Sequence, residues 1–397
     1  MSNASPVYWD PFDRAIARDP YPIYRRMRAE EPLYYNDRHD FYALARSQDI
    51  ETGLLDWETY SSSRGPILEI IQSGIEIPPG TLLMEDPPIH GIHRKLLSRV
   101  FTPRRVAALE PEIRDYAVRC LEPLVGLDRF DLMAEFANEL PMRVIGMLLG
   151  IPESDQRTVR DRADAKLRTD PGQPMKVTEK ALTDTELFAE YIDWRADHPS
   201  DDLMTELLNA EFEDETGVRR TLTREEILTY VTVLAGAGNE TTARLIGWLV
   251  ALLDRYPDQR ADLVENRDLI PNTIEETLRF EPTGHAIARY VTTEVELYGR
   301  TIPAGSAMML LVASANRDED RWEDGERYDI RRKIDRHVTF GRGPHHCLGN
   351  ALARIEGNIA LEEILKRFTE WEVDWDNAAL SSTSTMRGWE TLPISVA

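Results

Sequence analysis

The 397-residue sequence is poor in cysteine and contains no long run of apolar residues. Its two cysteines, Cys120 and Cys347, cannot build a disulfide framework, which is typical of proteins in a reducing compartment. The longest apolar stretches, such as residues 246–253, are far too short to span a bilayer. The first residues show neither the apolar core of a signal peptide nor an amphipathic transit sequence. We therefore expect a cytoplasmic protein with no membrane anchor.

Positive charge is also scarce. The sequence has 47 Lys and Arg residues against 70 Asp and Glu residues, and its net charge is −23. Such a surface repels phosphate groups, so nucleic acid is excluded as a partner. One stretch, HRKLLSRVFTPRR at residues 93–105, contains five Lys or Arg residues and no acidic residue. It is either a docking face for an acidic partner or an ordinary solvated helix face.

Helical periodicity dominates the sequence, and strand-like runs are short. The predicted helices are residues 104–121, 141–150, 223–256, 271–280 and 349–368. The predicted strands are residues 41–46, 286–297, 307–315 and 392–397. Thr223 and Glu226 form the pattern of a capping box at the start of the longest helix. No repeat, low-complexity tract or linker divides the chain, so we predict a single domain over residues 1–397 that is mainly α with a small β-rich part.

Cys347 lies in the glycine-rich stretch FGRGPHHCLGNALARIE, residues 340–356. The glycines and Pro344 predict a tight turn that leads directly into a helix. A cysteine at a helix N-terminus is favoured as a thiolate, and a single thiolate flanked by glycines suits one axial bond to haem iron. Phe340 is in a position to pack beside the sulfur.

Three other roles for this cysteine stay open on the residues alone. Zinc could be held by His345, His346 and Cys347, although adjacent residues seldom converge on one tetrahedral ion. Cys347 could also be a nucleophile beside a histidine. Simple packing is the commonest role of a buried cysteine, and it is the one that we predict for Cys120.

Phe340, Gly343, Cys347 and Gly349 match the pattern F-x-x-G-x-x-x-C-x-G, which resembles the haem-binding loop of the cytochrome P450 family. Further motifs of that family follow in its order along essentially the whole chain. They are the haem-propionate helix in residues 86–105, the oxygen-binding stretch AGNETT in residues 237–242 and the E-x-x-R motif of Glu276 and Arg279. The resemblance is to the soluble bacterial type. It implies a cytochrome P450 fold with haem b between the oxygen-binding helix and the helix after the cysteine loop.

The resemblance also implies a role for individual residues. Cys347 is the axial ligand of the haem iron, and Thr241 and Glu240 are catalytic, with the hydroxyl holding oxygen and the carboxylate relaying protons. Glu240 stands where Asp is commoner in the family. The predicted cofactor contacts are His90, Arg94, Ala237, Gly238, Arg289, Phe340, His345 and Gly349. Glu276 and Arg279 form a structural network whose third member is Arg332 rather than Arg331.

Glycine and consecutive threonines also allow the helix around residues 237–242 to open locally.

The predicted substrate pocket is mostly apolar. Side chains alternate along a strand, so His285 and Ile287 share the haem side with Arg289. His285 could also be a polar residue without substrate contact. The predicted lining residues are Ile67, Leu68, Ile70, Ile71, Val233, Leu234, His285, Ile287, Thr385 and Met386. Such a lining favours a lipophilic substrate, and residues 64–85 and 165–190 are expected to control its entry.

These inferences predict a haem-thiolate monooxygenase. It would hydroxylate a fatty acid, steroid, terpene or aromatic substrate with O2 and two electrons from a separate ferredoxin and ferredoxin reductase. We expect the chain to be a monomer and the ferredoxin to dock near Lys95, Arg99, Arg104 and Arg105. The alternatives are a peroxygenase of the same fold that uses H2O2, a non-catalytic haem-binding sensor or carrier, and a zinc-binding structural protein.

Overall fold

The computed structural model describes residues 5–77, 80–99, 101–178, 188–382 and 386–396. Helices make up most of it, as predicted. The α-helices are α1 (Arg14–Arg18), α2 (Tyr21–Glu30), α3 (Ser47–Leu55), α4 (Leu68–Ser73), α5 (Ile89–Ser98), α6 (Pro103–Ala108), α7 (Glu110–Leu121), α8 (Glu139–Leu149), α9 (Glu153–Leu167), α11 (Ala189–Asp197), α12 (Leu203–Asn209), α13 (Arg224–Arg255), α14 (Pro257–Glu265), α15 (Ile270–Phe280), α16 (Val312–Ala315) and α17 (Asn350–Arg367).

The strands form one larger sheet and several small ones. The strands are β1 (Leu33–Asn36), β2 (Phe41–Leu44), β3 (Tyr60–Ser61), β4 (Arg129–Asp131), β5 (Glu211–Glu213), β6 (Arg219–Thr221), β7 (Ile287–Val291), β8 (Val295–Leu297), β9 (Arg300–Ile302), β10 (Ala307–Leu310), β11 (Trp371–Val373), β12 (Ala379–Leu380), β13 (Trp389–Thr391) and β14 (Pro393–Val396). The five-stranded sheet has the order β1-β2-β10-β7-β3, in which only β2 and β10 run parallel. Strands β11, β14 and β4 form a second sheet.

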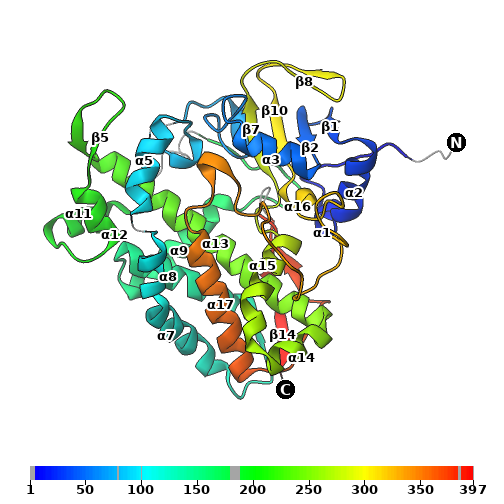
Figure 1. Ribbon diagram of the computed structural model, residues 1–397. Helices are drawn as coiled ribbons and strands as arrows, with labels where there is room; N and C mark the ends of the chain where they lie inside the picture. The colour runs from blue at the N-terminus through cyan, green and yellow to red at the C-terminus, as the bar shows by residue number, and fades with distance from the viewer. Residues whose placement is uncertain (1–4, 78–79, 100, 179–187, 383–385, 397) are drawn as a thin grey trace.

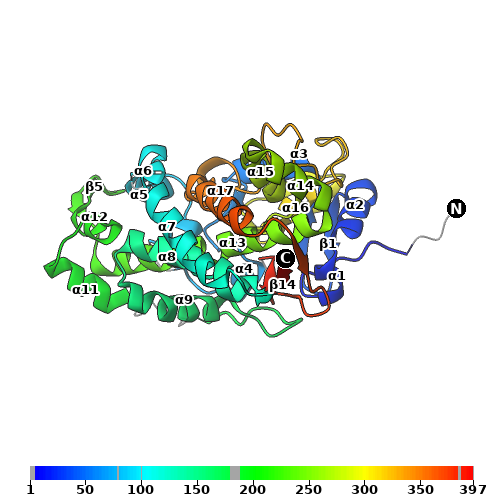
Figure 2. The same ribbon diagram turned by 90° about the horizontal axis from the view of Figure 1, so that it is seen from below.

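Two hydrophobic cores underlie this division into a helical and a β-rich part. The larger core joins residues of α7, α8, α13, α15 and α17, and the smaller one joins the five-stranded sheet to α2, α3 and α16. Figure 1 shows the sheet beside the N-terminal helices, and Figure 2 shows the helical layer extending away from it. The fold class that the sequence predicts is confirmed.

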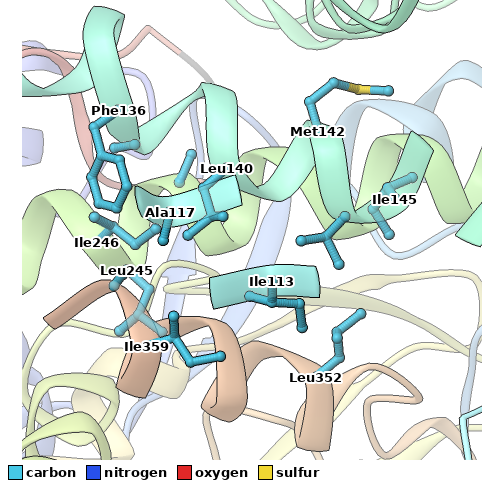
Figure 3. Packing of buried hydrophobic residues seen from close by; sticks show 14 of the residues in the cluster. Ile113, Ala117, Phe136, Leu140, Met142, Ile145, Leu245, Ile246, Leu352 and Ile359 are labelled. Atoms are coloured by element: carbon cyan, nitrogen blue, oxygen red, sulfur yellow. The ribbon is translucent and has the colours of Figure 1, made fainter. Parts of the chain in front are cut away.

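Helix α13 lies at the centre of the helical part and contacts α8, α9, α15 and α17. Thr223 and Glu226 form the predicted capping box at its start, and the helix ends at Arg255, just before the predicted Tyr256–Pro257 boundary. Nearly every residue from Thr242 to Leu253 is buried, because α8, α9, α15 and α17 surround this half of the helix. Figure 3 shows apolar side chains of α7, α8, α13 and α17 converging in this core.

Several sequence-based boundaries were wrong. Residues 104–121 form two helices, α6 and α7, that meet at Leu109. The predicted strand at 286–297 is divided into β7 and β8. The predicted strand at 307–315 ends at Leu310, and residues 312–315 form the short helix α16, because a short buried apolar run does not distinguish strand from helix. The helix is continuous through residues 237–242, and its ability to open locally stays a prediction. Within the described ranges, no helix is both long and apolar enough to cross a membrane.

Candidate functional site

The cysteine loop folds back on itself immediately before α17. Gly341 and Gly343 have φ angles of +67° and +66°, which residues with side chains rarely adopt. A Cβ at Gly343 would also lie 3.0 Å from the carbonyl oxygen of Leu54. The N–H of Cys347 donates to the carbonyl of Phe340 at 2.8 Å and closes the loop. The turn that the glycines predict therefore holds the thiol three residues before the helix starts.

Burial and the neighbouring groups have opposite effects on the pKa of Cys347. Burial raises the pKa of its thiol, whereas the N–H of Gly349 and the guanidinium groups of Arg94 and Arg354 act to lower it. The helix end and the cations thus favour a thiolate, as predicted, but in the protein alone burial outweighs them. A cationic metal centre bonded to the sulfur would supply the stabilisation that the thiolate lacks. Among the described residues, no group of three or more His, Cys, Asp or Glu side chains is arranged to hold a metal ion. The described structure therefore shows no set of protein ligands for zinc.

Three of the predicted cofactor contacts converge beside this loop with few protein partners. The rings of His90, on α5, and His345 lie with centroids 4.2 Å apart. Neither Nε2 atom has a hydrogen-bond partner among the described residues. Arg289, on β7, is only 5% exposed, yet its guanidinium makes a single hydrogen bond there, to the carbonyl of the adjacent Ala288. We call His90, His345, Arg289 and the neighbouring Arg94 the donor cluster.

In the donor cluster, burial lowers the pKa values more than the nearby carboxylates of Glu85 and Asp86 raise them. Burial, reinforced by Arg94, lowers the pKa of His90 to about 4. Burial, reinforced by His90 and Arg289, lowers that of His345 to about 3. Burial also lowers the pKa of Arg289 to about 10. Buried donors without acceptors and a buried cation without a carboxylate are costly. The cluster therefore fits a ligand that brings two carboxylates, as haem does with its propionates.

One face in the middle of α13 is open. Ala237 is exposed and Val233, Leu234 and Thr241 are half-exposed, although the second half of this helix is buried. Small residues along this face suit the close approach of a flat apolar group. A Cβ on the neighbouring Gly236 would meet no atom within 4 Å.

Gly238 is half-buried, and its missing side chain faces α8. A Cβ at this position would lie 2.5 Å from Cδ1 of Ile145. The glycine therefore lets α8 approach α13 closely, and its contact with the cofactor stays a prediction. Gly349 behaves differently, because a Cβ there would meet nothing within 4 Å.

The two predicted catalytic residues differ in their partners. The hydroxyl of Thr241 donates to the carbonyl of Ala237 at 2.8 Å, one turn earlier on α13. Glu240 is 6% exposed, and its Oε1 accepts from Nη2 of Arg244 at 2.9 Å. Arg244 was not predicted. Its spacing of four residues from Glu240 was the one available signal.

The predicted E-x-x-R network is fully formed. Glu276 and Arg279 are completely buried and joined by two hydrogen bonds of 2.7 Å. The other three N–H groups of Arg279 donate to the carbonyls of Asn316, Gly325 and Arg327. Arg332 lies 3.3 Å from Glu276, whereas Arg331 pairs with Asp262 instead.

Phe340 is packed by residues that the sequence analysis missed. The guanidinium of Arg354 lies 4.5 Å from the centroid of its ring, and His337 lies on the ring with a centroid distance of 5.8 Å. Glu275 contacts both His337 and Arg354. Burial raises the pKa of Glu275, but the bonds to His337 and Arg354 outweigh it and bring the pKa to about 2. Glu275 directly precedes the E-x-x-R motif, and nothing in the sequence marks it.

The predicted pocket residues separate into two groups. Ile67, Val233, Leu234, His285, Ile287 and Met386 are half-buried and so retain accessible surface. Leu68, Ile70 and Ile71 are buried, and α4 packs on β7 and β10, so these three were wrongly assigned to the pocket. An apolar loop sequence does not reveal which side chains face the sheet. Thr385 lies outside the described residues.

The basic stretch lies next to the cysteine loop, because Arg94 on α5 donates to the carbonyl of His346. Lys95, Arg99 and Arg104 are exposed. Arg105 is exposed too, but it forms a two-pronged ion pair with Glu206 at 2.6 and 2.8 Å.

Comparison with known proteins agrees with this geometry. The profile of the family "Cytochrome P450" matches residues 174–394. Over 392 residues the chain is 37% identical to cytochrome P450 123 of Mycobacterium bovis, covering 98% of this chain and 96% of that protein. Among solved structures, cytochrome P450 CYP109Q5 from Chondromyces apiculatus is 32% identical, with a TM-score of 0.87 and 98% of each chain covered. CYP109E1 from Bacillus megaterium in complex with testosterone is 28% identical, with a TM-score of 0.85, covering 96% of this chain and 99% of that one.

Proposed function

The chain belongs to the cytochrome P450 family and is a haem-dependent monooxygenase, and from this premise we propose that it hydroxylates a small lipophilic substrate with electrons from a ferredoxin and its reductase. The observation that carries the proposal is the donor cluster beside Cys347. It gathers arginines and hydrogen-bond donors around a thiol, and among the described residues its arginines form no ion pair with a carboxylate. Thiolate and carboxylate-binding donors together are what haem b requires of a protein.

Haem b with a cysteine thiolate ligand is the cofactor of the family, and it supplies the activation of dioxygen, the co-substrate. We assign Cys347 as the thiolate ligand, with Phe340 packed beside the loop. The donor cluster would bind the propionates, and the open face of α13 at Ala237 would cover the opposite side. Gly349 leaves room for close approach at the start of α17.

Thr241 and Glu240 would donate and transfer protons beside the open face of α13. The hydroxyl of Thr241, now on the Ala237 carbonyl, can turn to donate to an incoming oxygen. Glu240 keeps one carboxylate oxygen free of any partner among the described residues, so it can accept and pass on a proton. Both residues lie on one short segment of a rigid helix.

The substrate class is inferred from the half-buried apolar residues near the open face, among them Val233, Leu234 and Ile287. The related CYP109E1 was solved with testosterone, which supports inclusion of steroids beside fatty acids, terpenes and aromatic compounds. An optical titration of the ferric protein with these four classes tests the proposal. We expect one class to shift the haem from low to high spin with saturation, and product to form with O2. A haem-loaded protein that responds to no member and forms no product would contradict it.

We place the ferredoxin on Lys95, Arg99 and Arg104, because they are exposed, carry no ion pair among the described residues and adjoin the cysteine loop through Arg94. Arg99→Glu should slow reduction by ferredoxin severalfold at low salt and leave substrate binding unchanged. Arg219→Glu, an exposed arginine on β6, is the control. A reduction rate that is independent of salt and equal in both variants would exclude this docking face.

We infer that residues 1–397 work as one unit and as a monomer. Both parts of the fold contribute to the donor cluster, Arg289 from the sheet and His90 from α5. Sedimentation of the loaded protein tests the monomer. The intact Thr241–Glu240 pair supports O2 over H2O2 as oxidant. Turnover with peroxide and none with the ferredoxin system would establish the peroxygenase alternative.

A further inference from the structure

Three side chains of alternating charge, Arg244, Glu390 and Arg168, connect Glu240 to the surface. Arg244 on α13 contacts Glu240 at 2.9 Å and Glu390 on β13 at 3.4 Å, and Glu390 contacts Arg168 at 2.7 Å. The side-chain exposure rises from 7% at Glu240 and 8% at Arg244 to 35% at Glu390 and 64% at Arg168. These residues, which we call the ion chain, come from α13, β13 and the segment that follows α9.

The position of Arg244 is determined by its surroundings. Its Nη1 donates to the carbonyl of Trp389. A Cβ at Gly388 would lie 2.5–2.8 Å from three carbons of the Arg244 side chain, so this glycine makes room for it. Only one of the carboxylate oxygens of Glu240 binds Arg244. The other, Oε2, is buried and has no partner among the described residues.

The ion chain cannot conduct protons, because arginine does not release its proton in proteins. Its two arginines can only hold carboxylates in place. With Oε1 of Glu240 bound to Arg244, the direction of Oε2 is set, and Oε2 is the atom that can carry a proton towards Thr241. The guanidinium also gives this buried carboxyl group an ion-pair partner at 2.9 Å.

The outer end of the ion chain belongs to a segment that crosses between two parts of the fold. The Thr169 N–H donates to the carbonyl of Ser382 at 3.0 Å, and the Met175 N–H donates to Glu69 on α4 at 2.9 Å. Residues 168–175 thus contact both α4 and the region after β12, on either side of the predicted pocket. While this segment is docked, the charge of Glu390 is shared between Arg168 and Arg244. Without Arg168, Glu390 would compete more strongly with Glu240 for Arg244.

We propose that Arg244 is a positioning residue that holds Glu240 for proton delivery, and that the Arg168–Glu390 contact makes this hold depend on docking of residues 168–175. The proposal rests on the monooxygenase function proposed above. In this proposal, substrate binding needs the docked segment and proton delivery needs an oriented Glu240. The ion chain links the two.

The test compares Arg244→Gln with the wild type and with Arg143→Gln as a matched control. Arg143 on α8 forms an ion pair with Glu139, also four residues apart, at 3.5 Å. For Arg244→Gln we expect the fraction of electrons recovered in product with O2 and ferredoxin to fall about tenfold. Turnover with H2O2, which brings its own protons, should stay within twofold, as should the substrate dissociation constant from the spin-state titration. Arg244→Lys should restore part of the coupling, and Arg168→Gln should show a smaller loss.

A second readout does not depend on activity. Arg244→Gln removes the guanidinium that donates to Oε1 of Glu240. Infrared difference spectra of Arg244→Gln against wild type should therefore show a displaced carboxyl band of Glu240 that Glu240→Gln/Arg244→Gln lacks. Gly388→Ala, which displaces Arg244 without removing its charge, should show the coupling loss without loss of folding.

Three results would overturn the proposal: unchanged coupling in Arg244→Gln, an equal fall with O2 and with H2O2, or no displaced carboxyl band. An equal fall would mean that Arg244 only supports the fold. If the wild type itself forms no product with O2, the monooxygenase proposal fails, and the infrared result then stands on its own.

Discussion

The E-x-x-R network and the donor cluster each contain a buried arginine, and they are built in opposite ways. In the E-x-x-R network, every N–H group of Arg279 has an acceptor and Glu276 balances its charge. In the donor cluster, Arg289 has one hydrogen bond among the described residues, to its neighbour's carbonyl, and it forms no ion pair there, although the charge of Asp86 acts on it from a distance. Both arginines are buried to a similar degree, at 0% and 5% exposure.

The difference separates a structural cluster from a binding cluster. A buried charge that is fully paired contributes to one defined fold, whereas a buried charge left unpaired lowers stability until a ligand arrives. The first cluster should therefore matter to the protein with and without its cofactor. The donor cluster should stabilise only the protein with bound cofactor, and it should lower the stability of the apoprotein.

The largest effect is expected in the paired cluster. Glu276→Ala leaves Arg279 buried without its carboxylate, which should cost about 3–5 kcal/mol of unfolding free energy. Urea denaturation of the apoprotein measures this loss. Arg331→Ala, which breaks the neighbouring exposed pair with Asp262, is the control and should cost less than about 0.5 kcal/mol. Equal losses in the two variants would remove the distinction between the clusters.

A smaller effect with a different readout is expected for Arg289→Leu. Removal of a buried cation that binds a carboxylate should weaken haem retention by roughly 2 kcal/mol, or about thirtyfold. The rate of haem transfer to an acceptor protein in excess measures it. Arg64→Leu, an exposed arginine of the same region, should leave that rate unchanged. A variant that retains haem as well as the wild type would exclude Arg289 from the site.

The donor cluster should also affect how the stability of the apoprotein depends on pH. Burial and Arg94 lower the pKa of His90 to about 4, against Glu85 and Asp86, which raise it. The unfolded chain therefore binds a proton that the folded chain does not between about pH 6.5 and 4. Stability should fall by roughly 1–2 kcal/mol as the pH drops from 6.5 to 5. This fall is the contribution of His90 alone. His345, whose pKa burial lowers to about 3, adds one of similar size. His90→Phe should therefore roughly halve the total slope, and an unchanged slope would place its origin elsewhere.

The smallest effect is expected where charges are exposed. Arg105 and Glu206 form an ion pair with good geometry, but their side chains are 49% and 34% exposed. Arg105→Gln should lower the unfolding free energy by about 0.2–0.5 kcal/mol, and less at high salt. A loss comparable with that of Glu276→Ala would show that pairing geometry, and not burial, determines the cost.

The parts of the site that local sequence specifies could be predicted. The positive-φ glycines of the cysteine loop, the capping box of Thr223 and Glu226 and the pair of Glu276 and Arg279 each depend on residues close in the chain. Arg332 could be placed through the resemblance and its spacing to Phe340, because the family keeps that spacing.

What could not be predicted depends on packing between distant segments. Gly238 was predicted from the oxygen-binding stretch, but its close approach to Ile145 involves another helix. Leu68 and Ile71 lie on the short helix α4, whose contact with the sheet has no local signature. The ion chain joins residues 240 and 244, residue 390 and residue 168, and the sequence does not show that these distant segments meet.

The central claim is that the donor cluster is a cofactor site that the protein maintains at a cost. Chemical denaturation of wild type and Arg289→Leu, each as apoprotein and loaded with haem, tests it directly. We predict that the apo variant is at least as stable as the apo wild type, while the loaded variant is clearly less stable than the loaded wild type. A variant that is destabilised equally in both states would show that Arg289 supports the fold and would contradict the claim.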